Sequence, residues 1–363
     1  MPTFAADKSW DATSFREAVQ AVLDGFVAMQ GQHLAPLGPD AAELVTAAHE
    51  SVSGGKRLRA SFCYWGYCCV AEASPGTPAH EAVVRAAAAL ELLHASALVH
   101  DDLMDGSDTR RGRPAAHRRF ERLHGTLGMR GDPGQYGAAG AILLGDLLLS
   151  WADELLRTCG LDPEPVRAAL GYFDTTRSEV IAGQFLDVTA QTRGSCDVAT
   201  AMRVLRYKSA KYSVERPLHI GATLAGGDDG VRAALSDFGL PLGEAFQLRD
   251  DLLGVFGDPK VTGKPAGDDL REGKRTVLVA LALESAAAGD VAELDRSLGT
   301  TLTDEQVTAL QQLIRASGAP DRVEQLIDEL TTRALRALAD APVTEPARAA
   351  LRALAQAATQ RDL

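Results

Sequence analysis

The chain has 363 residues, of which 46% are hydrophobic, and a formal net charge of −12. This acidic balance excludes the broad basic surface that nucleic-acid binding requires, so no nucleic-acid partner is expected. The basic residues gather instead in short segments, as suits a protein that binds a small anionic ligand. These segments are GGKRLR (54–59), residues 110–122 and REGKR (271–275).

The cysteines and the N-terminus indicate a cytoplasmic protein. The cysteines form no CxxC pair and are odd in number, so neither a zinc site nor a disulfide framework is predicted. The first fifteen residues lack the basic start and apolar run of a signal peptide. No integral membrane segment is expected, because Glu91, His94 or Asp146 interrupts the longest apolar stretches. The cysteines are Cys63, Cys68, Cys69, Cys159 and Cys196.

The long Ala/Leu-rich stretches have helical rather than alternating periodicity, which predicts an all-α fold. No stretch has the composition of a linker between two cores, so we expect a single domain over residues 1–363. Two Gly/Pro-rich stretches, 128–137 and 257–269, are predicted loops, and the second is a candidate lid. The predicted helices are 14–34, 39–52, 56–72, 78–104, 116–127, 136–159, 163–190, 197–226, 230–257 and 272–288, followed by three amphipathic segments within 303–363.

An acidic cluster ends the predicted helix 78–104, in the sequence LVHDDLMD. Asp101 and Asp105 are four residues apart and so project from one helix face, with Asp102 beside them. Magnesium is commonly held by one or two carboxylates together with waters and substrate phosphates, so the cluster is a plausible half-site for this ion. The alternative is a solvated acidic helix end.

Arginines follow the acidic cluster directly, at positions 110, 111 and 113 of a turn-rich stretch. Guanidinium groups match phosphate oxygens in two-pronged hydrogen bonds, so this arrangement indicates a site for a metal-bound diphosphate. His94 lies seven residues before Asp101, two helical turns along the same stripe, and is expected to face the same cavity. Scattered surface arginines and a core histidine are the alternatives.

The motifs together resemble those of the trans-isoprenyl diphosphate synthases, or polyprenyl synthetases. The resemblance covers about residues 50–280 and is strongest to bacterial, actinobacterial-like synthases of geranylgeranyl diphosphate. It implies an isoprenoid-synthase-type helical bundle around a central elongated cavity, and a homodimer. The motifs, in family order, are GGKRLR, ExxHxxxLxHDDxxD, RRGxP, AILLGDLLL, GQxxD, a Lys-Ser pair, FQxxDD and GKPxxDDLREGK.

The resemblance also implies a role for each matching residue. Asp101, Asp102 and Asp105 would be the first aspartate-rich motif, with Asp101 and Asp105 as ligands of Mg²⁺. Isopentenyl diphosphate would bind without metal to Lys56, Arg59, His94 and Arg111. The allylic diphosphate, whether dimethylallyl, geranyl or farnesyl, would bind to Arg110, Lys208, Ser209, Gln247, Lys264 and Lys274, with Gln184 and Asp187 lining the same cavity.

The second aspartate-rich motif departs from the family pattern. FQLRDDLLG supplies Asp250 and Asp251 but has Gly254 where the family has a third aspartate. We expect Asp250 to bind Mg²⁺ with help from Asp251, and Asp268 or Asp269 to substitute for the missing carboxylate. Two opposed clusters would hold about three Mg²⁺ ions on the diphosphate as negative charge accumulates on it.

The stripe below Asp101 bears on the length of the product. Ala97 and Leu93 continue this stripe, so the growing tail should lie along them. Burying a five-carbon unit gains about 3 to 4 kcal/mol, so a steric floor rather than affinity must end elongation. Ser96 and Ala97 are small, where members of the family that stop at fifteen carbons tend to carry bulky residues. The resemblance therefore implies geranylgeranyl diphosphate as the product, with Leu93 or a residue of a facing helix such as Phe185 as the floor.

Three other readings of the sequence are possible. A class I terpene cyclase also ionises a prenyl diphosphate, but it would not need GGKRLR and RRGRP for a second diphosphate. A non-catalytic subunit of a prenyltransferase is suggested only by Gly254. A purely structural helical bundle does not account for the paired aspartate clusters.

Overall fold

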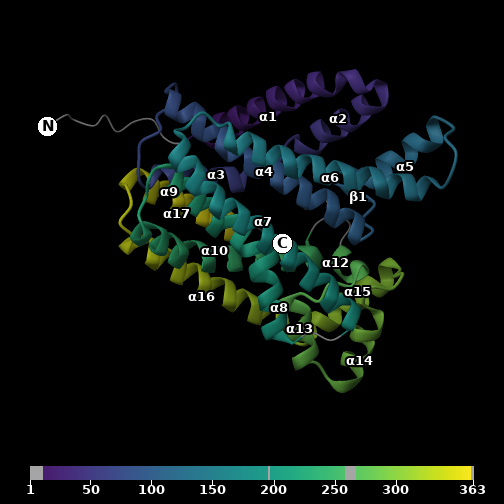
Figure 1. Ribbon diagram of the computed structural model, residues 1–363. Coiled ribbons are helices and arrows are strands. Elements are labelled where there is room, and N and C mark those ends of the chain that lie inside the picture. The colour runs from purple at the N-terminus through teal and green to yellow at the C-terminus, as the bar shows by residue number, and fades with distance from the viewer. Residues whose placement is uncertain (1–10, 195–196, 258–266, 361–363) are drawn as a thin grey trace.

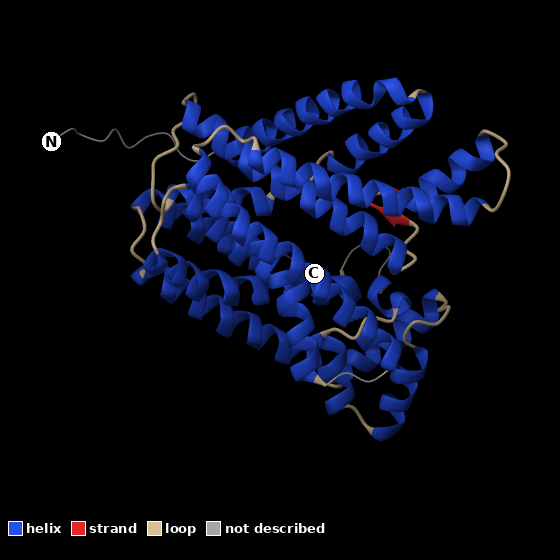
Figure 2. Cartoon of the chain, in the orientation of Figure 1, coloured by secondary structure: helices blue, strands red, loops and turns tan. Residues whose placement is uncertain are grey.

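The computed structural model describes residues 11–194, 197–257 and 267–360. Figure 1 shows helices throughout this part of the chain, and Figure 2 shows one short strand pair, so the all-α prediction is confirmed. The elements are α1 (Ala12–Leu34), η1 (Ala35–Leu37), α2 (Pro39–Val52), α3 (Leu58–Cys68), α4 (Pro78–Met104), β1 (Thr109–Arg110), β2 (Arg113–Pro114), α5 (Ala116–Thr126), α6 (Pro133–Arg157), α7 (Pro163–Arg193), α8 (Val198–Leu205), η2 (Arg206–Glu215), α9 (Arg216–Leu224), α10 (Asp229–Phe256), α12 (Asp268–Glu272), α13 (Val277–Ser285), α14 (Ala288–Ser297), α15 (Asp304–Ala316), α16 (Ala319–Asp340) and α17 (Glu345–Thr359).

Helix α4 is the central helix of the first half of the chain and packs against α6, α3 and α1. Thr77 caps its N-terminus by accepting a hydrogen bond from the His80 amide, and Pro78 occupies the first turn. By length and composition α4 could cross a membrane, the one helix of the described residues that could, but 78% of its most apolar stretch is buried. Its apolar character is therefore that of a core helix.

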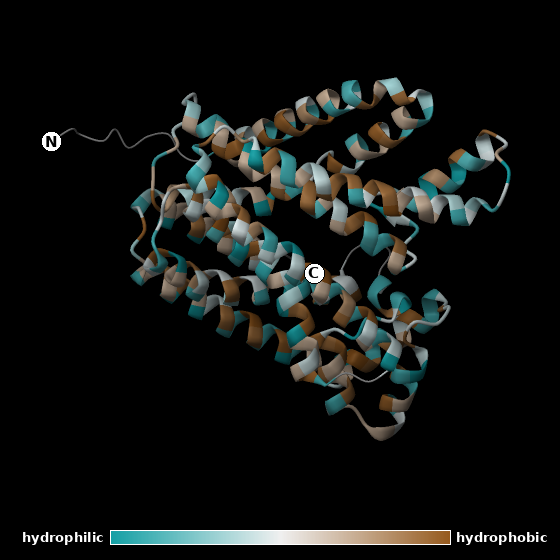
Figure 3. Cartoon of the chain, in the orientation of Figure 1, coloured by the Kyte–Doolittle hydropathy of each residue, from teal (hydrophilic) through white to brown (hydrophobic). Residues whose placement is uncertain are grey.

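Helix α10 is the central helix of the second half and packs along α16. It contributes Leu235 and Phe238 to the larger hydrophobic cluster, and Leu248 and Val255 to a second cluster around α13, α15 and α16. The two clusters therefore share one helix. Hydrophobic and hydrophilic residues alternate along α16 in Figure 3, as expected for a helix with one face on the core.

The predicted helix 197–226 is helical throughout, but its middle part, η2, is a π-helix. Glycines on both sides let η2 approach its neighbours closely. A Cβ on Gly183 of α7 would lie 2.4 Å from the Lys208 amide nitrogen, and one on Gly243 of α10 would lie 2.5 Å from the Ala210 carbonyl oxygen. The segment is thus clamped between two long helices, and π-helical turns are frequent at functional sites.

Other departures from the predicted elements are local. The hairpin β1–β2, the short α12 and the helix α14 were not predicted, and the predicted helix 272–288 is observed as α13 alone. Two strands of two residues each are too short to produce an alternating pattern. Most of the candidate lid, residues 258–266, lies outside the described residues.

Candidate active site

The end of α4 carries the first aspartate cluster, and its side chains are held by residues from other helices. Asp101 Oδ1 accepts a hydrogen bond of 2.9 Å from Gln184 of α7 and lies 3.1 Å from Lys208 Nζ. Lys208 in turn lies 2.6 Å from Asp187 Oδ2. Burial raises the pKa of Asp101, but the charges of Lys208 and Lys274 outweigh it, so the pKa falls below its usual range. Asp101 is therefore ionised, and Gln184, Asp187 and Lys208 lie together as predicted.

Asp105 lies one turn further along α4, and its side chain is only 2% exposed. Lys274 Nζ is 3.1 Å from Oδ2, yet neither carboxylate oxygen accepts a hydrogen bond from any described residue. Burial, and then the charge of Asp101, raises the pKa of Asp105 to about 6. A buried carboxylate with so few donors is suited to a cation, so Asp101 and Asp105 fit the predicted half-site for Mg²⁺.

Ready-made metal sites are absent from the described part of the chain, where no three His, Cys, Asp or Glu side chains cluster suitably. Asp101 and Asp105 at one helix end, and Asp250 at the other, are a donor set of the kind that shares Mg²⁺ with phosphate oxygens.

Arg110, on β1, makes a two-pronged ion pair with Asp102. Its Nε lies 2.9 Å from Asp102 Oδ1, and its Nη2 contacts the same oxygen. Burial lowers the pKa of Arg110, but the bond to Asp102 outweighs this effect and raises it. Asp102 is 3% exposed and is paired with Arg110.

A second basic group lies beside His94, and it contacts Tyr212 and Ser213 of the π-helix η2. His94 Nδ1 is 2.9 Å from the Tyr212 hydroxyl, and the Arg59 guanidinium lies 4.2 Å from the centre of the Tyr212 ring. Arg59 also donates to Ser213 Oγ at 2.7 Å. Burial, followed by the charge of Arg59, lowers the pKa of His94 well below its usual value, so His94 is neutral. A neutral imidazole among arginines can donate a hydrogen bond to an anion.

The remaining members of this group come from the GGKRLR turn and the hairpin. Arg111 donates to the Ser53 carbonyl at 3.0 Å and lies against Gly55, where a Cβ would be 2.9 Å from its Nη2. Gly55 has a φ of +96°, so both its backbone and its close neighbour require glycine. Lys56 is exposed on the same turn. A hollow of about 280 Å³ lies beside these residues, lined also by Arg110 and Arg113.

The second aspartate cluster, Asp250 and Asp251, lies near the C-terminal end of α10. Asp251 is 5% exposed and accepts a hydrogen bond of 2.9 Å from Gln247 on its own helix. Burial raises the pKa of Asp251 to about 8, and the charges of Asp269 and Asp250 add to the shift. Asp251 is thus protonated at neutral pH, and Asp250 is only partly buried.

The missing third aspartate has a structural counterpart in Asp269. The Asp269 carboxylate of α12 lies directly over Gly254, where a Cβ would be only 2.0 Å from Asp269 Oδ2. The glycine therefore leaves room for a carboxylate that arrives from another element. This is the substitution expected of Asp268 or Asp269, and it identifies Asp269 as the residue in that place.

Lys274 joins the two clusters. Its Nζ lies 3.1 Å from Asp105, 3.6 Å from Asp269 and 2.5 Å from Glu272. Glu272 also accepts a hydrogen bond of 2.5 Å from Ser107, just after α4. The ends of α4 and α10 thus meet through α12, although 149 residues separate Asp101 from Asp250 in sequence.

Other predicted residues have less defined surroundings. Ser209 lies on η2, and Lys264 lies outside the described residues. Leu93 and Ser96 are buried on α4, and Ala97 lies between His94 and Asp101, whose partners come from η2 and α7. The expectation for Phe185 is wrong. Its side chain is 71% exposed at the surface of α7, so it cannot close an internal cavity of this chain.

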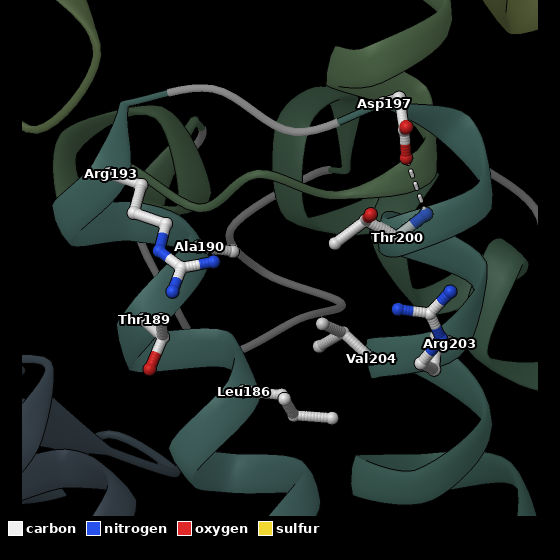
Figure 4. A pocket seen from close by; sticks show the side chains of 8 residues that line it. All are labelled: Leu186, Thr189, Ala190, Arg193, Asp197, Thr200, Arg203 and Val204. Carbon is white, nitrogen blue, oxygen red and sulfur yellow. Dashed lines mark hydrogen bonds between the residues drawn. The ribbon is translucent and has the colours of Figure 1, made fainter.

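A hollow of about 470 Å³, larger than the one beside Arg111, lies between α7 and α8. Figure 4 shows it between the end of α7 and α8, with Arg193 and Arg203 on opposite walls and Leu186 and Val204 at its base. Both arginines are exposed. None of the predicted site residues lines it, so size does not identify the site here.

Several residues that complete the site were not predicted. Tyr212 and Ser213 were missed because a tyrosine and a serine in a helix have no distinctive spacing, and Glu272 was read only as part of a basic segment. Their proximity to the Lys-Ser pair and to Lys274 was the available signal.

Comparisons with known proteins agree with this arrangement. The polyprenyl synthetase family model matches residues 41–316. A geranylgeranyl diphosphate synthase of Mycobacterium tuberculosis is 34% identical over 89% of this chain and 84% of its own length. A geranylfarnesyl diphosphate synthase of Aeropyrum pernix is 31% identical over 82% of this chain and 87% of its own length.

A solved structure gives the same result for the fold. It is a geranylgeranyl pyrophosphate synthase from Corynebacterium glutamicum, complexed with isoprenyl diphosphate and magnesium, with 41% sequence identity. The similarity covers 97% of this chain and all of that one, with a TM-score of 0.94. With the family model matching most of the chain and the relatives named as prenyl diphosphate synthases, this chain belongs to the polyprenyl synthetase family of trans-prenyltransferases.

Proposed function

We propose that this enzyme couples isopentenyl diphosphate head-to-tail to dimethylallyl, geranyl and farnesyl diphosphate, and releases geranylgeranyl diphosphate. The observation that carries the proposal is the bridge from Asp105 through Lys274 to Asp269, which brings two aspartate-bearing helix ends to one place. The relatives named above make products of different length, so the length is argued from this chain's own residues.

The ends of α4 and α10 would bind the allylic diphosphate. Asp101 and Asp105 would hold Mg²⁺ on one side and Asp250 on the other, with Asp251 assisting. When bound, about three Mg²⁺ ions would supply Lewis-acid stabilisation of the leaving diphosphate. Lys208 and Lys274 would exchange carboxylate partners for phosphate oxygens, and Arg110 would contribute its free edge. Lys264, Ser209 and Gln247 would complete this pocket.

Isopentenyl diphosphate would occupy the second basic group. Arg59, Arg111 and Lys56 would neutralise its phosphates, and neutral His94 would donate a hydrogen bond. The allylic carbon–oxygen bond breaks with its electron pair going to the diphosphate, and the double bond of isopentenyl diphosphate forms the new carbon–carbon bond. A proton is then lost, and the departing diphosphate would accept it. Holding the two diphosphate substrates in the orientation in which they react supplies much of the rate acceleration.

Incubation with isopentenyl diphosphate, Mg²⁺ and each of the three primers tests the proposal. We expect all three to be extended to the geranylgeranyl product. Ala97→Phe should shorten the main product, because Ala97 lies between His94 and Asp101 on the stripe where the tail would run. Ala292→Phe, on the exposed face of α14, is the size-matched control and should leave the product unchanged. An unaltered product distribution for Ala97→Phe would contradict this position of the tail.

A homodimer is part of the proposal. Large apolar side chains are exposed along α6 and α7, including Leu143 at 60% and Phe185 at 71%. Contiguous apolar surface of this kind marks interaction sites, and α6 and α7 contact each other, so their exposed faces form a surface for a second copy. Leu143→Glu should yield monomers in light scattering, whereas Leu127→Glu, on the loop after α5, should not. A monomeric wild type that binds lipid vesicles through this face would refute the dimer.

The cytoplasm is the location we propose. Four cysteines of the described residues are free thiols, three of them buried, and Cys68 and Cys69 are adjacent in sequence. Persistent free thiols fit a reducing compartment.

A further inference from the structure

Arg249, the residue immediately before Asp250, donates hydrogen bonds from all three of its guanidinium nitrogens to the C-terminal helices. Nη1 and Nη2 donate to the two carboxylate oxygens of Glu324 on α16, at 2.5 and 2.7 Å. Nε donates to the carbonyl of Thr359, the last residue of α17, at 3.0 Å. Arg249 is 9% exposed and Thr359 is 4% exposed, so the contact with the end of α17 is buried.

This contact stabilises the end of α17 and the end of α10 together. The last carbonyls of α17 have no partner within their own helix, and a cation at a helix C-terminus is favourable. A two-pronged arginine–carboxylate pair also fixes orientation as well as distance. The end of α10 is thereby held in a defined rotation about its own axis.

Helix α10 needs such a restraint because Pro241 lies within it. Proline removes one hydrogen bond of the helix and is the commonest cause of kinks, so the segment after Pro241 is less rigidly fixed by the segment before it. Gly243 packs on η2 just after the proline. Glu244, which is 2% exposed, then pairs with Arg206 of η2 at 2.7 Å. Arg249 forms the ion pair that follows along the helix, one residue before Asp250.

We propose that Arg249 is a positioning residue through which α16 and α17 set the orientation of Asp250 and so the affinity for Mg²⁺–diphosphate. This inference rests on the proposed role of Asp250 as a Mg²⁺ ligand. It gives the C-terminal helices, which carry none of the predicted site residues, a function in the reaction.

The test compares Arg249→Met with a matched control, Arg348→Met. Arg348 also caps helix carbonyls, those of Leu338 and Ala339 at the end of α16, and pairs with Glu345 at 3.0 Å. Calorimetry of Mg²⁺ binding in the presence of inorganic pyrophosphate gives a readout independent of turnover. We expect Arg249→Met to weaken Mg²⁺ binding roughly two- to thirtyfold, and Arg348→Met to lower the melting temperature without weakening it.

If Arg249→Met does not fold, two milder variants test the same proposal. Glu324→Gln should weaken Mg²⁺ binding in the same direction by a smaller factor, and Arg249→Lys should retain part of the wild-type affinity. If Asp250→Asn abolishes the binding but Arg249→Met, Glu324→Gln and Arg348→Met all leave it unchanged, Arg249 is only structural. If Asp250→Asn has no effect on binding, the proposed site itself is wrong.

Discussion

The two aspartate-bearing helix ends place Asp101 and Asp251 in opposite electrostatic settings. At the end of α4, Asp101 is paired with Lys208 and its pKa is lowered, so its charge is stabilised in the protein alone. At the end of α10, burial raises the pKa of Asp251 to about 8, and the third carboxylate is supplied by Asp269 from another helix. Asp101 is charged because cations of the chain itself lie beside it, whereas Asp251, like the buried Asp105, gains its charge when a cation arrives.

Of the substitutions at the two helix ends, Asp101→Asn should cause the largest loss of turnover. Turnover should fall by at least about 10²- to 10³-fold, the loss found when one stabilising group is removed from a developing anion. Steady-state assays with a farnesyl primer measure this effect. Asp321→Asn, an exposed position on α16, should keep wild-type turnover. Comparable rates for Asp101→Asn and Asp321→Asn would remove the α4 end from the mechanism.

Gly254→Asp, which restores the family's third aspartate, tests how the end of α10 is packed. Gly254→Asp should destabilise the fold by about 1 to 3 kcal/mol, because its Cβ would overlap the Asp269 carboxylate. Denaturant unfolding of Gly254→Asp, with and without Asp269→Ala, measures the effect. The double variant should recover much of the loss, whereas Asp268→Ala should recover none. Equal costs in all three backgrounds would mean that Asp269 does not occupy the space over Gly254.

The pH dependence of stability should have opposite signs for Asp101 and Asp251. A raised pKa means that the folded state holds a proton that the unfolded state has lost, so Asp251 stabilises the fold below about pH 4 and loses this contribution as the pH rises toward 8. The slope is at most about 1.4 kcal/mol per pH unit. Asp101, with a lowered pKa, contributes stability above about pH 4 that is lost as the pH falls further.

Unfolding in chelator-containing buffers across pH 4 to 8 measures this difference. Asp251→Asn should flatten the decline between about pH 6 and 8, above the raised pKa of Asp105, and Asp101→Asn should leave that part of the decline unchanged. A wild-type protein whose stability rises steadily over the whole range, with the same slope in Asp251→Asn, would contradict the buried, protonated state of Asp251.

The sequence alone determined the helical fold and most of the chemistry. Helical periodicity predicted α4 with both of its ends, and DDLMD, RRG and the Lys-Ser pair predicted side chains that the structure brings together. Residues four apart on one helix must share a face, so local spacing was enough to place Asp101 beside Asp105.

Tertiary structure alone decided which distant residues complete the site. The Tyr212–His94 bond and the Arg249–Glu324 pair join residues 118 and 75 positions apart, and no local pattern encodes them. Only the structure selects Asp269 rather than Asp268 as the carboxylate over Gly254. The exposure of Phe185 likewise depends on the rotation of α7 against its neighbours, which its own sequence does not specify. Periodicity fixes the faces of a helix, but packing decides what each face meets.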